Sequence, residues 1–281
     1  MRWEFGRRST NVEDWRGMGP SRTVVGGGLG ALLLALLVAL LGGDPSMVLE
    51  QTAPYEGPGQ VAPAPPQDDQ MAAFVSTVLG YTEDTWSQIF RENGSKYVEP
   101  KLVLFSGAVK SGCGNAQSAM GPFYCPLDQK VYIDLSFYND MQRRLGAGGD
   151  FAYAYVVAHE VGHHVQNLLG ISDQVQTMQR RVSKTQANAL SVRLELQADC
   201  FAGVWAHRTE KAQSFLEKGD VEEALNAAAA IGDDRLQKQS QGYVVPDSFT
   251  HGSSAQRVRW FTQGIKSGDI NQCNTFETNT L

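Results

Sequence analysis

The chain has 281 residues, of which 42% are hydrophobic and 9% are aromatic. This length and composition suffice for one large core or two small ones and exclude a chain that is disordered throughout. Its 24 basic and 30 acidic residues give a net charge of −6, and no Lys/Arg-rich run occurs beyond the extreme N-terminus, so nucleic acid is not an expected partner.

The N-terminal quarter predicts a membrane anchor. Residues 1–22 are polar, and we predict a tail without a core of its own. Residues 23–41 carry no charge and approach the ~20 apolar residues that span a bilayer, which predicts one transmembrane helix. Residues 42–67 are rich in Pro, Gly and Ala, which is typical of an extended linker.

The charges on either side of the predicted span give its orientation. Five arginines precede it, whereas acids without Lys or Arg follow it, so the positive-inside rule predicts a cytoplasmic N-terminus and a periplasmic or extracellular domain on the cell (inner) membrane. A cleaved signal peptide is the alternative. The long leader with three acids and the poor cleavage site GGDPSM disfavour it.

The remaining residues, 68–281, are predicted to form the folded domain. Apolar spacing predicts a helix that starts near residue 68, breaks at Gly80 and resumes over residues 86–90. A short strand is expected from Lys101. A second strand with two different faces is expected from Lys130, and we assign it the role of holding an extended substrate, with an ordinary structural strand as the alternative.

Four cysteines divide into two candidate pairs. Cys113 and Cys125 bracket a short Gly-rich loop, which predicts a disulfide in an oxidising compartment and leaves Cys200 and Cys273 as the second pair. Four cysteines allow three pairings. A thiolate metal site is a further alternative, disfavoured because no C-x-x-C spacing occurs.

The segment FAYAYVVAHEVGHHVQNLLG contains an H-E-x-x-H pattern in an apolar run of helical length. Residues four apart lie about 40° apart around a helix, so the imidazoles of His159 and His163 project toward one point and can bind zinc. Glu160 lies about 100° away from His159, which leaves its carboxylate free to act as the general base toward a zinc-bound water. The alternative is a chance string with structural histidines.

Two carboxylates recur in a later helical, largely apolar stretch, ANALSVRLELQADCFAGVWAHRTEKA. Buried carboxylates are costly unless they are paired or bound to metal. We therefore predict Glu195 as the third zinc ligand and Asp199 as the acceptor for the free N–H of a ligating histidine. A solvated edge of the helix is the alternative.

Near the C-terminus, His251 precedes the candidate N-cap residues Ser253 and Ser254 of a helix that contains Arg257. A histidine at a helix entrance could donate to the oxyanion of a tetrahedral intermediate. It could equally be a surface residue near the cap.

Together, HEVGHHVQ, ELQADCFAGVWA and THGSSAQRV resemble the bacterial neutral zinc metallopeptidase family, and the resemblance covers nearly the whole chain. More distantly, the chain is similar to gluzincins of the CAAX prenyl protease and heat-shock protease type, which carry H-E-x-x-H, a later E-x-x-x-D and an H-P-x-x-x-x-R segment. Gly252 stands where those enzymes have proline, so their substrate class is not carried over.

The resemblance implies the following roles: zinc on His159, His163 and Glu195, Glu160 as base, Asp199 behind the ligands, and His251 and Arg257 on the third segment. We predict an α+β, mostly helical zincin-like domain with a small sheet, preceded by one transmembrane helix. It would bind one zinc ion and hydrolyse peptides or proteins. A membrane-anchored scaffold with structural zinc and a hydrolase of non-peptide amides are the alternatives.

Overall fold

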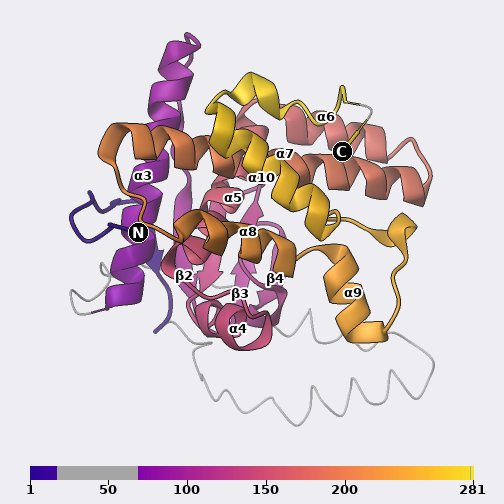
Figure 1. Ribbon diagram of the computed structural model, residues 1–281, viewed down its shortest axis with the longest axis horizontal. Helices are drawn as coiled ribbons and strands as arrows, with labels where there is room; N and C mark the ends of the chain where they lie inside the picture. The colour runs from indigo at the N-terminus through magenta and orange to yellow at the C-terminus, as the bar shows by residue number, and fades with distance from the viewer. Residues whose placement is uncertain (18–68, 279) are drawn as a thin grey trace, which may run out of the picture.

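The computed structural model describes residues 1–17, 69–278 and 280–281 (Figure 1). Within these residues the fold is mostly helical, with a small sheet, as the sequence predicted. The helices are α3 (Gln70–Glu92), α4 (Phe137–Arg144), α5 (Asp150–Leu168), α6 (Ile171–Gln179), α7 (Lys184–Gln213), α8 (Asp220–Ala230), α9 (Asp233–Gln241) and α10 (Ser254–Ser267), with short 3₁₀ turns at Ser118–Met120, Pro246–Ser248 and Ile270–Cys273.

The described part of the chain contains two sheets. The strands are β1 (Val12–Asp14), β2 (Lys101–Phe105), β3 (Ala108–Ser111), β4 (Gly114–Gln117), β5 (Phe123–Cys125) and β6 (Lys130–Asp134). One sheet has the order β1-β2-β6-β5, in which β1, β2 and β6 are parallel and β5 is antiparallel to β6. The β3–β4 hairpin forms the other.

The four-stranded sheet has two different buried faces. Val131 and Ile133 of β6 join the main core, whereas Tyr132 packs with Val103 and Phe105 of β2 in a second apolar cluster. The alternation predicted for this strand is therefore confirmed, although the strand stops at Asp134 and α4 begins at Phe137. Side chains of a strand point alternately to opposite faces, which explains the two clusters.

The prediction that β6 holds the substrate is wrong. β2 pairs with one edge of β6 along its whole length, and β5 pairs with the other edge over residues 130–132, so most main-chain groups of β6 are used within the sheet. A strand can add an extended peptide only along an unpaired edge. Beyond β6, on the side away from β2, β5 is the last strand of the four-stranded sheet.

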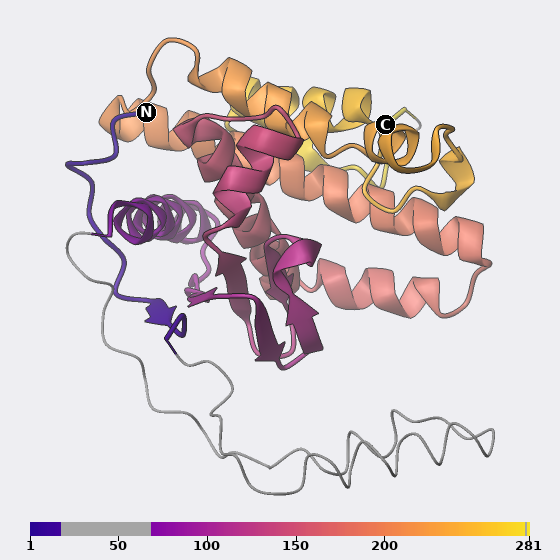
Figure 2. The same ribbon diagram turned by 90° about the horizontal axis from the view of Figure 1, so that it is seen from below.

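Residues 1–17 pack on the folded domain, so the predicted boundary between an N-terminal tail, 1–22, and a domain that starts at residue 68 is wrong for them. The segment runs along α3 and then forms β1, which pairs with β2 in parallel (Figure 2). Its polar side chains explain the error: Arg7, Ser9 and Asn11 all donate to Glu83 of α3, which is buried. Hydrogen bonds to this carboxylate fix the segment together with the β1–β2 pairing and the packing of Met1 and Trp3 on the core.

Gly80 does not break the first helix, because α3 is continuous from Gln70 to Glu92. A Cβ atom on Gly80 would lie 2.4 Å from the carbonyl oxygen of Arg7. The glycine therefore provides room for the N-terminal segment to cross the helix. A glycine inside a helix costs about 1 kcal/mol relative to alanine, which the packing of this segment offsets.

Helix α5 is central, and it packs against α3, α7 and α8. Helix α10 lies along α7 (Figure 1). The two helices approach closely at Gly264, where a Cβ would lie 2.0 Å from the carbonyl oxygen of Cys200. This close approach, near the end of α10, holds that helix against the middle of α7.

Both predicted disulfides are confirmed. Cys113–Cys125 closes the loop ahead of β5, and Cys200–Cys273 ties α7 to the C-terminal 3₁₀ turn. Among the residues that the structure describes, no helix is long and apolar enough to cross a membrane. The predicted span, 23–41, and the predicted linker, 42–67, lie outside the described residues.

Candidate active site

The H-E-x-x-H segment lies in the middle of α5, and residues Phe151–Gly162 of this helix are all buried. The helix contains four valines, which have only moderate helix propensity. Burial on nearly every side stabilises it instead, as is typical of a helix that is apolar all round. The histidine pair is thus held by the most enclosed element of the described fold.

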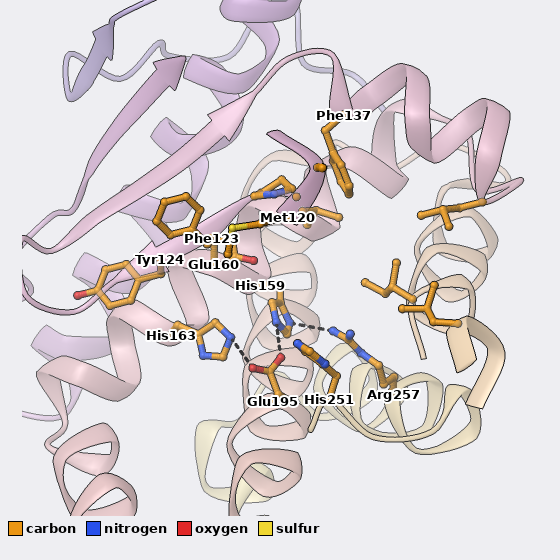
Figure 3. A pocket seen from close by; sticks show the side chains of 17 residues that line it. Met120, Phe123, Tyr124, Phe137, His159, Glu160, His163, Glu195, His251 and Arg257 are labelled. Atoms are coloured by element: carbon orange, nitrogen blue, oxygen red, sulfur yellow. Dashed lines mark hydrogen bonds and ion pairs between the residues drawn. The ribbon is translucent and has the colours of Figure 1, made fainter. Parts of the chain in front are cut away.

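The structure brings together the three predicted zinc ligands. Nε2 of His159 lies 3.2 Å from one carboxylate oxygen of Glu195, and Nε2 of His163 lies 3.4 Å from the other. Figure 3 shows the two imidazoles of α5 and the Glu195 carboxylate of α7 turned toward one another. Three ligands about 2.0–2.1 Å from one tetrahedral metal ion would lie roughly 3.3 Å apart, so the spacing fits zinc.

Hydrogen bonds at the far side of each ring support the same conclusion. Nδ1 of His159 donates to Asp199 over 2.8 Å, and Nδ1 of His163 donates to Gln166 over 2.9 Å. In a neutral imidazole the other nitrogen then carries a lone pair. With both rings neutral, two lone pairs face the Glu195 carboxylate, and a metal ion between them would satisfy all three groups.

Asp199 is fully buried behind His159 and accepts from three side chains. Arg257 donates to it twice, from Nε and Nη2, both over 2.9 Å, and the Tyr155 hydroxyl donates over 2.5 Å. Although burial opposes it, the Arg257 guanidinium holds the pKa of Asp199 below its ordinary value. Burial likewise opposes ionisation of His159, but Asp199 raises the pKa of this imidazole to about 10, so the surroundings favour positive charge here.

Glu160 lines a cavity of about 450 Å³ together with all three candidate ligands. Only 8% of its surface is exposed, and burial raises the pKa of its carboxyl. The cavity also contains apolar residues of four helices: Phe137, Leu145, Val156, Ile231 and Leu236. A carboxylate at the wall of an open, partly apolar cleft can exchange a proton with a bound molecule.

His251 faces the same cavity from the loop before α10, close to Glu195 in Figure 3. Its side chain is 52% exposed, and its Nδ1 lies 3.3 Å from Asp233. Asp233 also accepts from the backbone N–H groups of Thr250, His251 and Gly252, so one carboxylate holds the whole loop. The hydrogen bond with Asp233 raises the pKa of His251.

Strand β5 forms another part of the cavity wall, through Phe123 and Tyr124. The Tyr124 phenol points away from the candidate ligands (Figure 3) and lies 3.0 Å from Nδ1 of His164, while Asn167 donates to its oxygen over 3.1 Å. Nε2 of His164 must donate to the carbonyl of Val98, so Nδ1 accepts from Tyr124. This bond ties β5 to α5.

Four residues at the site were absent from the sequence-based predictions: Tyr155, Gln166, Asp233 and Tyr124. Helical spacing could have indicated two of them. Tyr155 lies four residues before His159 and Gln166 three residues after His163, so each shares a face with a ligand. Asp233 and Tyr124 reach the site from other elements, and no local pattern indicates them.

A second acidic cluster consists of Asp150, Asp220 and Glu223. The amino group of Met1 donates to Asp150 over 2.8 Å and lies 3.3 Å from Asp220. A cationic partner is therefore already present. This cluster lacks the converging lone pairs of the site on α5.

A sequence model of the "Putative neutral zinc metallopeptidase" family matches residues 1–276. The chain is 54% identical to the uncharacterized protein YpfJ of Escherichia coli K12, over 98% of this chain and 99% of that protein. It is 42% identical to the uncharacterized protein Rv2575 of Mycobacterium tuberculosis H37Rv, over 86% of each chain. No solved structure matches. Since the family model covers almost the whole chain, including every residue of the site, this protein belongs to the putative neutral zinc metallopeptidase family.

Proposed function

We propose that this protein is a zinc-dependent endopeptidase. One observation carries the proposal: two imidazole lone pairs and a carboxylate converge in an open cleft, beside a fourth residue, Glu160, that has no structural partner among the described residues. A purely structural zinc site is normally closed by four protein ligands. A site with three protein ligands, and with Glu160 beside them as a base, fits a hydrolytic zinc site instead.

His159, His163 and Glu195 would hold one zinc ion. When bound, zinc supplies Lewis-acid polarisation and acidifies water, which makes a strong nucleophile accessible near neutral pH. Asp199 and Gln166 fix the ring orientation of the two histidines, so the ligands need little rearrangement.

Glu160 would move the proton. Its carboxylate accepts a proton from the attacking water and then delivers it to the leaving nitrogen of the cleaved bond. Because the side chain is buried at the cavity wall, few bulk waters compete for that proton. Hydrolysis then needs no second acid.

His251 would stabilise the oxyanion. Asp233 favours the imidazolium form, and the ring faces the cavity from the loop before α10. An N–H donor aimed at developing negative charge is worth roughly 3 kcal/mol in acyl-transfer enzymes. Arg257 lies behind Asp199 and acts through that carboxylate.

Strand β5 would bind the substrate backbone. It ends the four-stranded sheet next to the cavity, so an extended peptide can pair with its outer edge. Such pairing recognises the main chain of a peptide and favours it over small-molecule amides. Peptides are therefore the favoured substrates, and hydrolysis of a non-peptide amide is one of the results that the test can give.

The test compares full-length parent protein with Glu160→Gln, and with Glu222→Gln as a matched control on the exposed face of α8. Zinc content and cleavage of an unbiased peptide library are measured. We expect one zinc in all three proteins and cleavage by the parent and the control alone. Full activity of Glu160→Gln would reject the base. Zinc binding without cleavage by any protein would favour a scaffold or another amide substrate.

We further propose that the domain is exported. Two disulfides support an oxidising compartment. The predicted single span with a cytoplasmic N-terminus does not fit this arrangement, because one crossing would separate residues 1–17 from the domain, whereas residues 12–14 are hydrogen-bonded to β2 and Arg16 is paired with Asp69. Hydrogen-bonded residues share one compartment, so we place residues 1–17 on the side of the domain.

Cysteine labelling of intact cells tests this topology. Phe5 is 98% exposed and Met120 is 70% exposed, so Phe5→Cys and Met120→Cys each present a reactive thiol. A membrane-impermeant maleimide should label both variants. Labelling of Met120→Cys alone would support the cytoplasmic N-terminus that the sequence predicts. Labelling of neither variant would contradict export of the domain.

A further inference from the structure

The catalytic cleft continues into a second cavity. Leu145, directly after α4, lines both cavities. On the opposite side, α9 borders both as well, with Leu236 in the first and Arg235 and Lys238 in the second. The second cavity has a volume of about 310 Å³ and lies between the end of α4 and α9.

The two cavities differ in chemistry. The part of the catalytic cleft next to Leu145 is apolar, with Ile231 and Leu236 on its walls. The second cavity is lined by Arg144, Leu145, Arg235, Lys238 and Gln239, so it has three cations and no acid. In a chain of net charge −6, this concentration of positive charge is distinctive.

The three cations have few partners in the described part of the chain. Arg144 lies 3.9 Å from Asp140 with its side chain 73% exposed, and neither Arg235 nor Lys238 forms an ion pair with a described residue. Cations near helix C-termini have a structural explanation, since they interact with the helix dipole, and this applies to Arg144 and Lys238. Arg235 is different because it lies in the first turn of α9, where the dipole disfavours a cation.

We propose that this basic cavity is a subsite for a carboxylate of the peptide substrate, next to a subsite for a large apolar side chain at Leu145, Ile231 and Leu236. The proposal rests on the proposed peptidase function and specifies its substrate class: peptides with an apolar residue close to the cleaved bond and an acidic group beyond it. The acidic group is either an Asp or Glu side chain or the C-terminal carboxylate. Opposite charges also attract such peptides at a distance.

The test measures binding separately from cleavage. Zinc-loaded Glu160→Gln protein is titrated with two fluorescent decapeptide mixtures, in which every leucine is followed within two positions by glutamate in one mixture and by lysine in the other. We expect roughly tenfold tighter binding of the glutamate mixture at low salt, because each exposed pair contributes up to about fivefold. The ratio should fall as salt rises.

Charge reversal locates the site. Adding Arg235→Glu and Lys238→Glu to the Glu160→Gln protein should invert the preference toward the lysine mixture. Lys184→Glu, at the distant start of α7, changes the charge of the protein in the same way as one of these substitutions and should leave the ratio as it was. Repeating the titration with C-terminally amidated peptides separates the sources, since weaker binding of both mixtures after amidation would assign the site to the free carboxylate.

Two results would overturn the proposal: equal binding of both mixtures that amidation does not weaken, or a preference that survives the double reversal. Failure of the peptidase function is a separate outcome. In that case the parent protein cleaves neither mixture, whereas the charge preference in binding persists. Conversely, if the parent protein cleaves peptides but binding shows no charge preference, the peptidase function stands and the carboxylate subsite is rejected.

Discussion

Two carboxylates that are largely removed from solvent, the buried Glu83 on α3 and the partly buried Glu195 on α7, illustrate how structural and candidate functional acids differ. Glu83 receives Nη2 of Arg7 over 2.8 Å, the Ser9 hydroxyl over 2.5 Å and the amide of Asn11 over 2.9 Å. Glu195 instead faces two imidazole nitrogens whose protons are on the opposite side of each ring. Glu83 thus has three fixed donors, whereas Glu195 faces two nitrogens that can bind either a proton or a metal ion.

The comparison shows that burial alone does not identify a functional acid. Both carboxylates lie inside the protein, and both would be costly to bury alone. Glu83 has a complete set of donors from residues 7–11, so it needs nothing further. Glu195 and its neighbours need a cation, which makes this position the candidate metal site.

Removing Glu195 should lower zinc affinity, whereas removing Glu83 should lower stability, and the larger effect is expected at Glu195. Glu195→Ala removes one of three metal ligands, and we expect zinc affinity to fall roughly a thousandfold, since structural zinc sites with four ligands bind with about 10–16 kcal/mol. Competition with a chromogenic chelator measures it. Parental zinc affinity in this variant would contradict the ligand assignment.

Glu83→Ala should leave zinc affinity intact and destabilise the fold. It leaves Arg7, Ser9 and Asn11 without their acceptor, and we expect a loss of about 2–3 kcal/mol in the free energy of unfolding because Arg7 remains half exposed. Urea unfolding of the zinc-loaded protein checks this. A substantial loss of zinc with unchanged stability would show that the two acids are not distinct.

Gln166→Met tests the support of the metal site at His163. The substitution keeps the volume but removes the acceptor of the His163 Nδ1 proton, so the ring loses its fixed orientation. We expect zinc affinity to fall about 10- to 100-fold, less than for Glu195→Ala. An unchanged affinity would mean that packing alone orients the ring.

Asp233→Asn tests the charge of His251. The hydrogen bond with Asp233 raises the pKa of this imidazole, so the cation is present below that pKa and is lost as pH rises through it. The asparagine amide keeps the acceptor for the three loop N–H groups but presents NH₂ to His251, which favours the neutral ring. We expect the alkaline limb of the kcat/KM profile to move to lower pH in the variant. An unmoved limb would exclude His251 as a cationic oxyanion donor.

The smallest effect is expected from Tyr124→Phe, which removes the bond between β5 and His164. Losing one hydrogen bond costs about 1 kcal/mol, and we expect a roughly three- to tenfold rise in KM with kcat and zinc content retained, because β5 would bind the substrate backbone less firmly. Tyr243→Phe, at a tyrosine that is 62% exposed, is the matched control. A fall in kcat alone would contradict a role in substrate positioning.

Local patterns predicted a large part of the fold. Helical spacing indicated α5, α7 and α10, the N-cap at Ser253 and the placement of two histidines and one glutamate on matching faces. The even number of cysteines and the short loop between the first two indicated both disulfides. Each of these features depends on residues that are close in sequence or on a small number of possible pairings.

Gly80 shows where such reasoning fails. As a local signal it predicts a break, whereas in the fold it provides the space for Arg7 to cross α3. The prediction for β6 failed for a similar reason, since its sequence does not show which neighbours occupy its two edges. In both cases the deciding contact joins residues that are far apart in the chain.

Local spacing was enough to predict the candidate metal site: two histidines four apart, a glutamate between them and a second acid on a later helix, because helix geometry converts that spacing into a shared face. The surroundings of that site depend on the tertiary fold. The Asp233 carboxylate behind His251, the Tyr124 bond to α5 and the packing of residues 1–17 on α3 all join distant elements. Such contacts arise from the packing of whole elements, which local periodicity does not encode.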